Sequence, residues 1–225
     1  MINIAPFFYA KNFTMNIQIF TVGPFQENTY LLTKDKQALL IDPGFDSERE
    51  YGEFKKILTD SGATLIAVCL THAHVDHILG LNRVLNDFDL PVYINQTDNY
   101  LWDHFSQQAA MFGFSADPVQ TDPKPLVAQP SVELGAFSFD VLFTPGHSPD
   151  HVSLYFKSQG IVIAGDVLFR ESIGRTDLYK GNFETLANSV KRELYTLPAS
   201  TKVYPGHGPA TTIANEKENN PFVRG

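Results

Sequence analysis

Short apolar segments recur along the chain, and many of them alternate with polar residues or are rich in β-branched residues. Such segments predict β-strands, because neighbouring side chains of a strand face opposite sides of the sheet. In the first half, the pattern predicts strands over residues 15–22, 28–33, 37–41, 65–70 and 91–94. In the second half, it predicts strands over residues 132–134, 137–143, 152–156, 161–164 and 202–204.

Apolar residues at helical spacing separate many of these strands. They predict helices over residues 47–61, from within the run 71–77 to residue 85, and over 97–110, 183–194 and 211–218. Ser47 is the expected N-cap of the first helix. Residues 117–130 contain four prolines and predict an irregular loop. Because strands and helices alternate in each half, we expect an α/β layered sandwich with helices covering the sheets.

The length and composition fit one globular domain. No linker-like segment divides residues 15–225, so we expect a single domain there. Residues 1–14 are expected to form a poorly ordered N-terminal extension, and whether the native start is Met1 or Met15 stays open. No run approaches the roughly 18 apolar residues of a membrane span, and we expect no membrane partner.

Charge and cysteine content narrow the class of protein. The net charge of −8 argues against broad binding to a nucleic-acid backbone. The single cysteine, Cys69, excludes an internal disulfide and suits a reducing compartment, so we expect a cytoplasmic protein. Cys69 lies in an apolar strand segment and is expected to be a packed core residue. The oligomeric state stays open.

Three histidines and one aspartate stand within the six residues 72–77, directly after the apolar segment 65–70: His72, His74, Asp76 and His77. Histidine is the commonest metal ligand among side chains. Four such groups so close together would repel one another, or would be buried without a partner, unless a cation lay between them. The run therefore predicts a divalent metal site.

Three further ligand candidates each follow an apolar segment and lie in or beside a turn: His147, Asp166 and His207. This pattern places each at the carboxyl end of a strand, where loops on a rigid scaffold build functional sites. Two other histidines are expected to have structural roles. His104 is expected to be a surface or capping residue, and His151 a hydrogen-bonding residue at a strand edge, although a ligand role for His151 stays open.

Seven candidates are too many for one tetrahedral zinc ion and suit two divalent ions that share a carboxylate and a water. In an extended segment His72 and His74 point the same way, whereas Asp76 and His77 begin the next turn and point elsewhere. One run can therefore serve two metals. Zinc is the first expectation, and iron or manganese stays open because these ions have overlapping affinities for His/Asp sites.

The Thr-His-x-His-x-Asp-His motif and the later ligands resemble, in order and over nearly the whole chain from Met15, the pattern of the metallo-β-lactamase superfamily. The resemblance implies a four-layer αβ/βα sandwich of two mixed β-sheets with helices on the outer faces. It also implies the role of each ligand: His72, His74 and His147 on the first metal, Asp76, His77 and His207 on the second, Asp166 bridging, and Asp42 orienting a ligand histidine.

Residues 165–178 and 204–222 are similar to the glyoxalase II-like branch, which hydrolyses thioesters such as S-lactoylglutathione. The resemblance implies a hydrolase in which a hydroxide held between two metals attacks a small-molecule thioester, with Asp76 and Asp166 as catalytic carboxylates. A thiolate leaves readily because thiol pKa values lie near about 8.5, so no dedicated general acid is needed.

The chain differs from that branch in the residues that bind the thiol part of the substrate. It resembles a short form without the C-terminal helical domain whose basic residues hold glutathione. The family's lysine and tyrosine contacts to glutathione are not matched in register, and Arg175, Tyr179 and Lys180 occupy that stretch. We expect Arg175 and Tyr179 to bind substrate. A structural salt bridge between Arg175 and Asp177 is the open alternative.

Other functions remain in competition. A persulfide dioxygenase keeps the same ligand types but uses one iron ion, and the motifs do not separate it from a hydrolase. A nuclease is disfavoured by the acidic charge and by the lack of an inserted cap domain after Asp166. A non-catalytic metal-binding module is disfavoured by the intact ligand set. β-Lactam hydrolysis is disfavoured by the composition and by the lack of a signal-peptide pattern.

Overall fold

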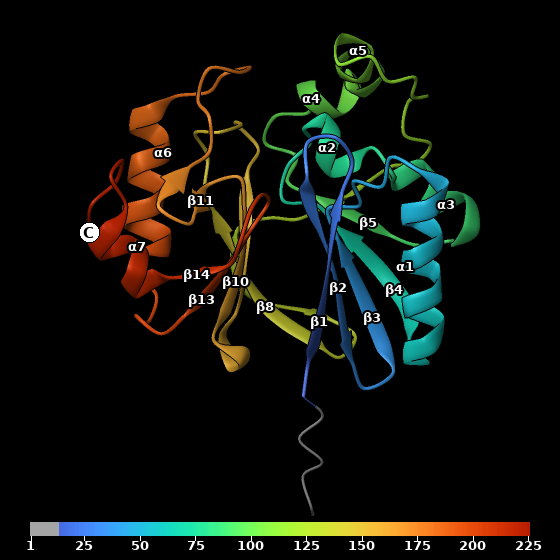
Figure 1. The fold of residues 1–225 in the computed structure, drawn as a ribbon, viewed down its shortest axis with the longest axis horizontal. Helices are drawn as coiled ribbons and strands as arrows, with labels where there is room; N and C mark the ends of the chain where they lie inside the picture. The colour runs from blue at the N-terminus through green and yellow to red at the C-terminus, as the bar shows by residue number, and fades with distance from the viewer. Residues whose placement is uncertain (1–13) are drawn as a thin grey trace, which may run out of the picture.

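Two six-stranded sheets face each other in the computed structural model, which describes residues 14–225, and helices cover their outer sides (Figure 1). The predicted extension over residues 1–14 lies outside the described part apart from Thr14. Within residues 14–225, the helices are all too short or too polar to cross a membrane.

The first sheet has strand order β1-β2-β3-β4-β5-β6. Its first two pairings are antiparallel, and the strands from β3 to β6 are parallel. The bounds are β1 (Asn16–Val22), β2 (Glu27–Lys34), β3 (Gln37–Ile41), β4 (Thr64–Cys69), β5 (Val92–Ile94) and β6 (Lys124–Pro125).

The second sheet has strand order β14-β13-β10-β9-β8-β7 and is antiparallel except between β10 and β13. The bounds are β7 (Gln129–Leu134), β8 (Phe137–Phe143), β9 (Val152–Phe156), β10 (Ile161–Gly165), β13 (Lys202–Pro205) and β14 (Thr211–Thr212). A separate two-stranded ribbon joins β11 (Leu168–Phe169) to β12 (Ser172–Ile173).

The helices lie outside the two sheets or at their edge (Figure 1). Their bounds are α1 (Glu48–Ser61), α2 (Val75–Ile78), α3 (Leu81–Asp87), α4 (Tyr100–Asp103), α5 (Phe105–Met111), α6 (Phe183–Ser189) and α7 (Ile213–Asn219), with a 3-10 turn η1 (Lys157–Gln159) and a π-turn η2 (Val190–Leu194). α1 begins as predicted, with Ser47 as its N-cap.

Three apolar clusters hold these layers together. Between the sheets, Leu39 and Ile41 of β3 pack in one cluster with Phe139 of β8 and Leu154 of β9. Outside the first sheet, α1 contributes buried side chains such as Phe54, and α6 with η2 does the same outside the second sheet. The expected αβ/βα sandwich of two mixed sheets is therefore confirmed.

The helix expected to run from the histidine motif to residue 85 is interrupted, and this prediction was wrong. α2 ends at Ile78, and α3 begins at Leu81. Between them Gly80 packs directly against Phe45: a Cβ at Gly80 would lie 2.8 Å from both the Cβ and the backbone nitrogen of Phe45. Its backbone N–H donates to the Pro43 carbonyl at 2.8 Å instead of continuing a helix. Tertiary packing breaks the periodic pattern here.

Other boundaries also differ from the predictions. The helix expected over residues 97–110 is divided into α4 and α5 at His104, and the helix over 183–194 ends in the π-turn. The loop expected over 117–130 contains β6 and the start of β7. The two-residue strands β6, β11, β12 and β14 are too short to show any alternation, which is why the sequence pattern misses them.

Candidate metal centre

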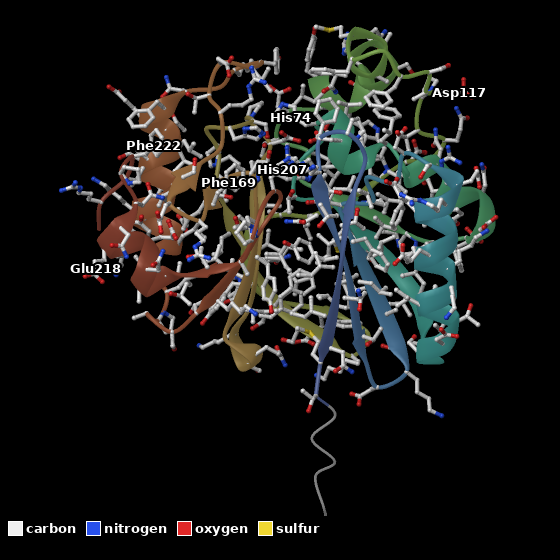
Figure 2. All side chains as sticks on the ribbon, in the orientation of Figure 1. His74, Asp117, Phe169, His207, Glu218 and Phe222 are labelled. Carbon is white, nitrogen blue, oxygen red and sulfur yellow. The ribbon has the colours of Figure 1, made fainter. Side chains whose placement is uncertain are left out.

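The seven candidate ligands meet at one edge of the two sheets. His72 and His74 lie in the segment between β4 and α2, and Asp76 and His77 lie in α2 itself. The other three follow the second sheet's strands: His147 after β8, Asp166 after β10 and His207 after β13. His74 and His207 lie between the two halves in Figure 2. Strand ends from both sheets thus supply one site.

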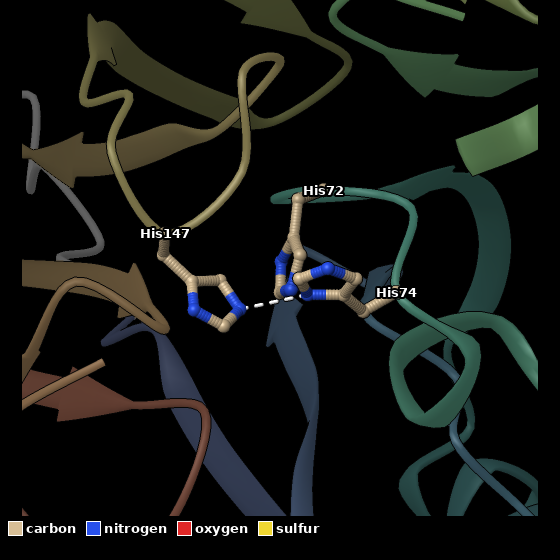
Figure 3. A group of neighbouring side chains, drawn as sticks. All are labelled: His72, His74 and His147. Carbon is tan, nitrogen blue, oxygen red and sulfur yellow. Dashed lines mark hydrogen bonds between the residues drawn. The ribbon is translucent and has the colours of Figure 1, made fainter. Parts of the chain in front are cut away.

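A first donor group consists of His72, His74 and His147, all buried. One ring nitrogen from each lies within 4.8 Å of the others. The Nδ1 atom of His74 stands 2.7 Å from the Nε2 atom of His147 (Figure 3). Three imidazoles that face a common point form the kind of nitrogen set that binds zinc, iron or copper.

A second donor group lies beside the first and consists of Asp76, His77 and His207. The Nε2 atom of His207 is 3.2 Å from Asp76 Oδ2 and 3.4 Å from Asp166 Oδ2. The other oxygen of Asp166 is 3.4 Å from His77 Nε2, and Oδ2 is also 3.5 Å from His147 Nε2. Asp166 therefore reaches donors of both groups.

Hydrogen bonds to backbone carbonyls fix the orientation of two rings. A carbonyl oxygen only accepts, so His147 donates its Nδ1 proton to the Arg175 carbonyl at 2.8 Å. By the same reasoning His207 donates its Nδ1 proton to the Phe25 carbonyl at 3.0 Å. In each ring the Nε2 atom is left facing the site.

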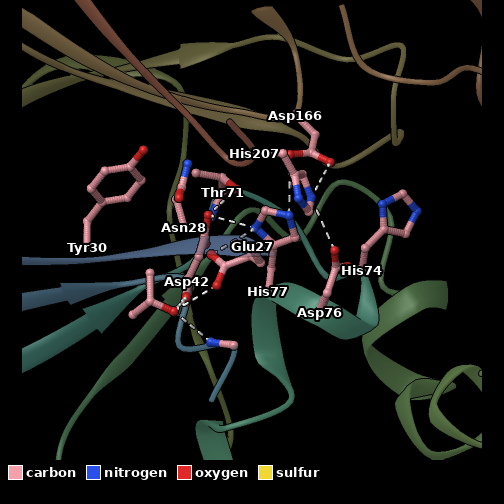
Figure 4. A network of polar contacts seen from close by, with 12 residues as sticks. Glu27, Asn28, Tyr30, Asp42, Thr71, His74, Asp76, His77, Asp166 and His207 are labelled. Carbon is pink, nitrogen blue, oxygen red and sulfur yellow. Dashed lines mark hydrogen bonds and ion pairs between the residues drawn. The ribbon is translucent and has the colours of Figure 1, made fainter. Parts of the chain in front are cut away.

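Asp42 fixes two more rings from below the site (Figure 4). Its Oδ2 atom lies 3.0 Å from His77 Nδ1 and 2.7 Å from Thr71 Oγ1. Because the Thr71 hydroxyl donates to Asp42, it accepts from His72 Nδ1 at 3.0 Å. Carboxylates that receive the second ring proton of a ligand histidine set its tautomer and raise its basicity. Asp42 does this for His77 directly and for His72 through Thr71.

The unpaired atoms of the site fit a metal pair. The Nε2 atoms of His72 and His77 and the Oδ1 atom of Asp166 are buried without any hydrogen-bond partner. Buried polar atoms are otherwise nearly always paired. Bonds of about 2.1 Å at tetrahedral angles put ligand atoms about 3.4 Å apart, which agrees with the 3.2–3.5 Å separations between the ring nitrogens and the carboxylates of Asp76 and Asp166. These residues therefore fit two divalent ions.

Burial and charge set the protonation of the donors. Burial lowers the pKa of His74 to about 3 and that of His72 well below its usual range, so both rings are neutral at pH 7. Burial raises the pKa of Asp166, but His77 and His207 outweigh it and hold that pKa well below its usual range. Neutral imidazoles and an ionised carboxylate are the states that bind metals.

The donors open into a cavity of about 590 Å³, which the two predicted substrate-binding residues also line. Tyr179 stacks on Tyr100 with ring centroids 4.1 Å apart. Arg175 forms a two-point ion pair with Asp177, with both N–O distances at 2.7 Å. The salt bridge weighed as the alternative for Arg175 is therefore present, while its carbonyl holds His147.

Several buried residues outside the seven candidates support the centre. His151 is not placed as a ligand: its Nε2 atom accepts the Asp166 backbone N–H at 3.0 Å, and its Nδ1 atom lies 2.9 Å from Thr144 Oγ1. Glu27 is buried 3.8 Å from His77 and accepts from Thr29. Thr71 opens the Thr-His-x-His-x-Asp-His motif and Glu27 lies in no motif. The spacing reveals neither role, because both roles arise only from the approach of separate segments.

The fold and the paired donor groups define a metallo-hydrolase centre between two sheets. The chain belongs to the metallo-β-lactamase superfamily, whose family model matches residues 22–207. Two curated relatives cover it almost fully. "Probable metallo-hydrolase YqgX" of Bacillus subtilis is 41% identical over 91% of this chain and 95% of its own length. "Hydroxyacylglutathione hydrolase GloC" of Haemophilus influenzae is 34% identical over 93% and 98%.

Solved structures give the same architecture. TTHA1623 in a di-iron-bound form is 38% identical with a TM-score of 0.82, covering 92% of this chain and 100% of that one. BLEG-1, described as a B3 metallo-β-lactamase, is 37% identical with a TM-score of 0.82, covering 93% and 100%. The buried His/Asp groups of this chain are thus consistent with a two-metal site, as in the first of these structures.

Proposed function

We propose that this chain is a thioester hydrolase that uses two divalent metal ions, zinc in the first instance. The observation that carries the proposal is that two donor groups share Asp166 and open into one cavity. When bound, a metal pair lowers the pKa of water and polarises a carbonyl oxygen. The GloC relative supports a thioester as the class of substrate.

The chain's own residues have three tasks in this proposal. The carbonyls of Arg175 and Phe25 and the carboxylate of Asp42 accept hydrogen bonds from Nδ1 of three rings and so hold Nε2 of each ring toward the centre. Asp76 and Asp166 provide the negative charge that holds both ions. No protein nucleophile is assigned, and the single cysteine, Cys69, is fully buried in the core, where burial raises its pKa.

The test measures turnover and metal content on one sample. The panel holds S-lactoylglutathione, acyl-coenzyme A, simple acyl thiols, a persulfide with oxygen uptake, and a β-lactam. We expect thioester turnover with about two metals per chain. Oxygen uptake with a persulfide, one iron per chain and no thioester turnover would establish the dioxygenase alternative. β-Lactam turnover alone would favour the activity for which BLEG-1 is named.

Ligand variants test the assignment of the two sites. His74→Ala should lower turnover by more than about 100-fold and reduce the metal content toward one per chain. His207→Ala should remove the other metal, and Asp166→Asn should weaken both sites. Asp60→Asn, an exposed aspartate on α1, is the matched control and should change neither turnover nor metal content. Unchanged turnover in His74→Ala would contradict the assignment.

A further inference from the structure

Exposed apolar side chains gather at the mouth of the metal cavity. Among residues 14–225, eight large apolar side chains are exposed, and four of them line this one cavity: Phe25, Tyr100, Met111 and Phe112. Met111 is 82% exposed and Phe112 47%. An exposed apolar cluster around a reactive site marks a surface that covers a ligand.

The exposed apolar cluster is carried by helices and loops that pack against the rest of the fold. α4 and α5 stand at the edge of the first sheet, next to α2 (Figure 1). The ring of Phe25, whose carbonyl holds His207, meets Phe112 edge to face with centroids 5.3 Å apart and also meets Phe114 at 6.0 Å. The apolar wall of Phe25, Met111 and Phe112 is therefore connected directly, through Phe25, to the loop that carries His207.

The arginine and lysine side chains in and beside this cavity are already paired with carboxylates. Among its lining residues Arg175 is the one arginine or lysine, and Asp177 pairs with both of its nitrogens. The neighbouring Lys180 is paired with Asp98 at 2.7 Å. Glutathione carries two carboxylates, and a complementary site would need cations that are free to pair with them.

We propose, on the basis of the thioester hydrolase function above, that the cavity selects thioesters with an apolar acyl chain on an uncharged thiol, and disfavours glutathione thioesters. The acyl chain lies along the wall of Phe25, Met111 and Phe112 while the thioester carbonyl faces the metal centre. The reaction is hydrolysis: water adds its hydroxyl to the acyl carbon, the carbon–sulfur bond breaks, and the thiolate leaves and takes up a proton.

Four substrates separate chain length from charge: acetyl and octanoyl thioesters of N-acetylcysteamine, which is neutral, and the same two of glutathione. Each fully buried methylene contributes about a fourfold gain in binding, and the wall covers the chain only in part. We expect octanoyl to exceed acetyl in kcat/KM by about 10- to 100-fold on the neutral thiol. At equal chain length the glutathione thioesters should be worse. A preference for acetyl or lactoyl glutathione would overturn the proposal.

Variants of the apolar wall provide a second test of the proposal. Phe112→Ser should lower kcat/KM for the octanoyl thioester at least fivefold more than for the acetyl thioester. Phe183→Ser is the matched control, because Phe183 on α6 is also 47% exposed and lies outside the cavity. Met111→Asp gives a second variant at a site too exposed to endanger folding. An effect of Phe112→Ser on acetyl and octanoyl substrates alike would contradict the wall's role.

A binding measurement distinguishes failure of this proposal from failure of the hydrolase function. Calorimetry with the non-hydrolysable thioether S-octyl-N-acetylcysteamine should show binding with a negative heat-capacity change, lost in Met111→Asp. If no thioester turns over but the thioether binds, the hydrolase function fails and the apolar cavity stands. If thioesters turn over but the thioether does not bind, the apolar cavity is wrong. A change of association state in Phe112→Ser without any kinetic change would make the wall a self-association surface.

Discussion

Single protons decide how the metal centre is arranged. His72, His77, His147 and His207 each point Nδ1 at an oxygen outside the site, and each leaves Nε2 to face inward. His151 is the contrasting case, because both of its nitrogens are hydrogen-bonded within the second sheet's loops. The distinction between ligand and supporting histidine therefore depends on hydrogen-bond direction and not on residue type.

A buried carboxyl near the centre gives a pH-dependent prediction. Burial raises the pKa of Asp150 to about 6. The unfolded chain ionises this group near pH 4, so the folded state is penalised as pH rises from about 4 to about 6. The loss is on the order of 3 kcal/mol in the free energy of unfolding and stays constant above pH 6.

Asp150→Asn should remove that loss. Urea unfolding at several pH values should show the variant gaining about 2–3 kcal/mol relative to the wild-type chain between pH 4 and pH 7. Asp117→Asn, at an exposed position, should give a curve parallel to that of the wild type. Parallel curves for Asp150→Asn as well would mean that the carboxyl ionises normally in the folded state.

At the scale of elements, the site depends on loops that follow strands. Gly206 shows how closely these loops approach one another: a Cβ there would collide with the Asp166 carboxylate and lie 2.8 Å from the His77 ring. The backbone N–H of Gly206 donates to the Gly165 carbonyl at 2.8 Å, which ties the loop after β13 to the loop after β10. Parallel strands β10 and β13 thus set the spacing of Asp166 and His207.

The cap of α1 gives a prediction that concerns stability alone. Ser47 accepts from the Glu50 N–H at 3.3 Å, and the Glu50 carboxylate accepts from the Ser47 N–H at 3.1 Å. Ser47→Ala should lower the free energy of unfolding by about 1 kcal/mol, with an unchanged urea m-value and unchanged activity. Ser158→Ala, an exposed serine in η1, should stay within about 0.5 kcal/mol of the wild type. Equal values for the two variants would rule out the cap's contribution.

At the scale of the molecule, the metal centre joins two halves of the chain. The run at 72–77 belongs to the first half, whereas His147, Asp166 and His207 come from the second. Direct contacts reinforce this connection, since the Tyr30 hydroxyl donates to the Pro205 carbonyl at 2.5 Å. A bound metal pair should therefore stabilise the whole fold and not only a loop.

Removal of metal should lower the midpoint of thermal unfolding. At a free metal concentration of about 100 times Kd, binding adds about 2.7 kcal/mol to stability, which corresponds to about 5 to 10 °C for a chain of this size. We expect this decrease after chelation and recovery when zinc is restored, measured by circular dichroism alongside metal analysis. An unchanged midpoint, with metal content falling to zero, would show that the ions do not join the two halves.

Strong local patterns made much of the fold predictable. The strands predicted over 37–41, 137–143 and 152–156 match the observed bounds. Each segment either alternates clearly or is continuously apolar, and each ends at a turn. The continuous helices expected up to residue 85 and over 97–110 were wrong, because Gly80 and His104 interrupt them. At Gly80, packing against Phe45 overrides a periodic pattern that remains helical in the sequence.

By itself, the sequence predicted seven donor candidates, because His and Asp side chains clustered at 72–77 favour a bound cation and the three later candidates each follow an apolar segment. Its apolar periodicity also determined that sheets and helices form layers. The tertiary structure alone decided which oxygen accepts each ring proton, that Asp177 neutralises Arg175, and that an apolar wall borders the cavity. These features require atoms distant in the chain to come within about 3–6 Å, and no local pattern records the distance between them.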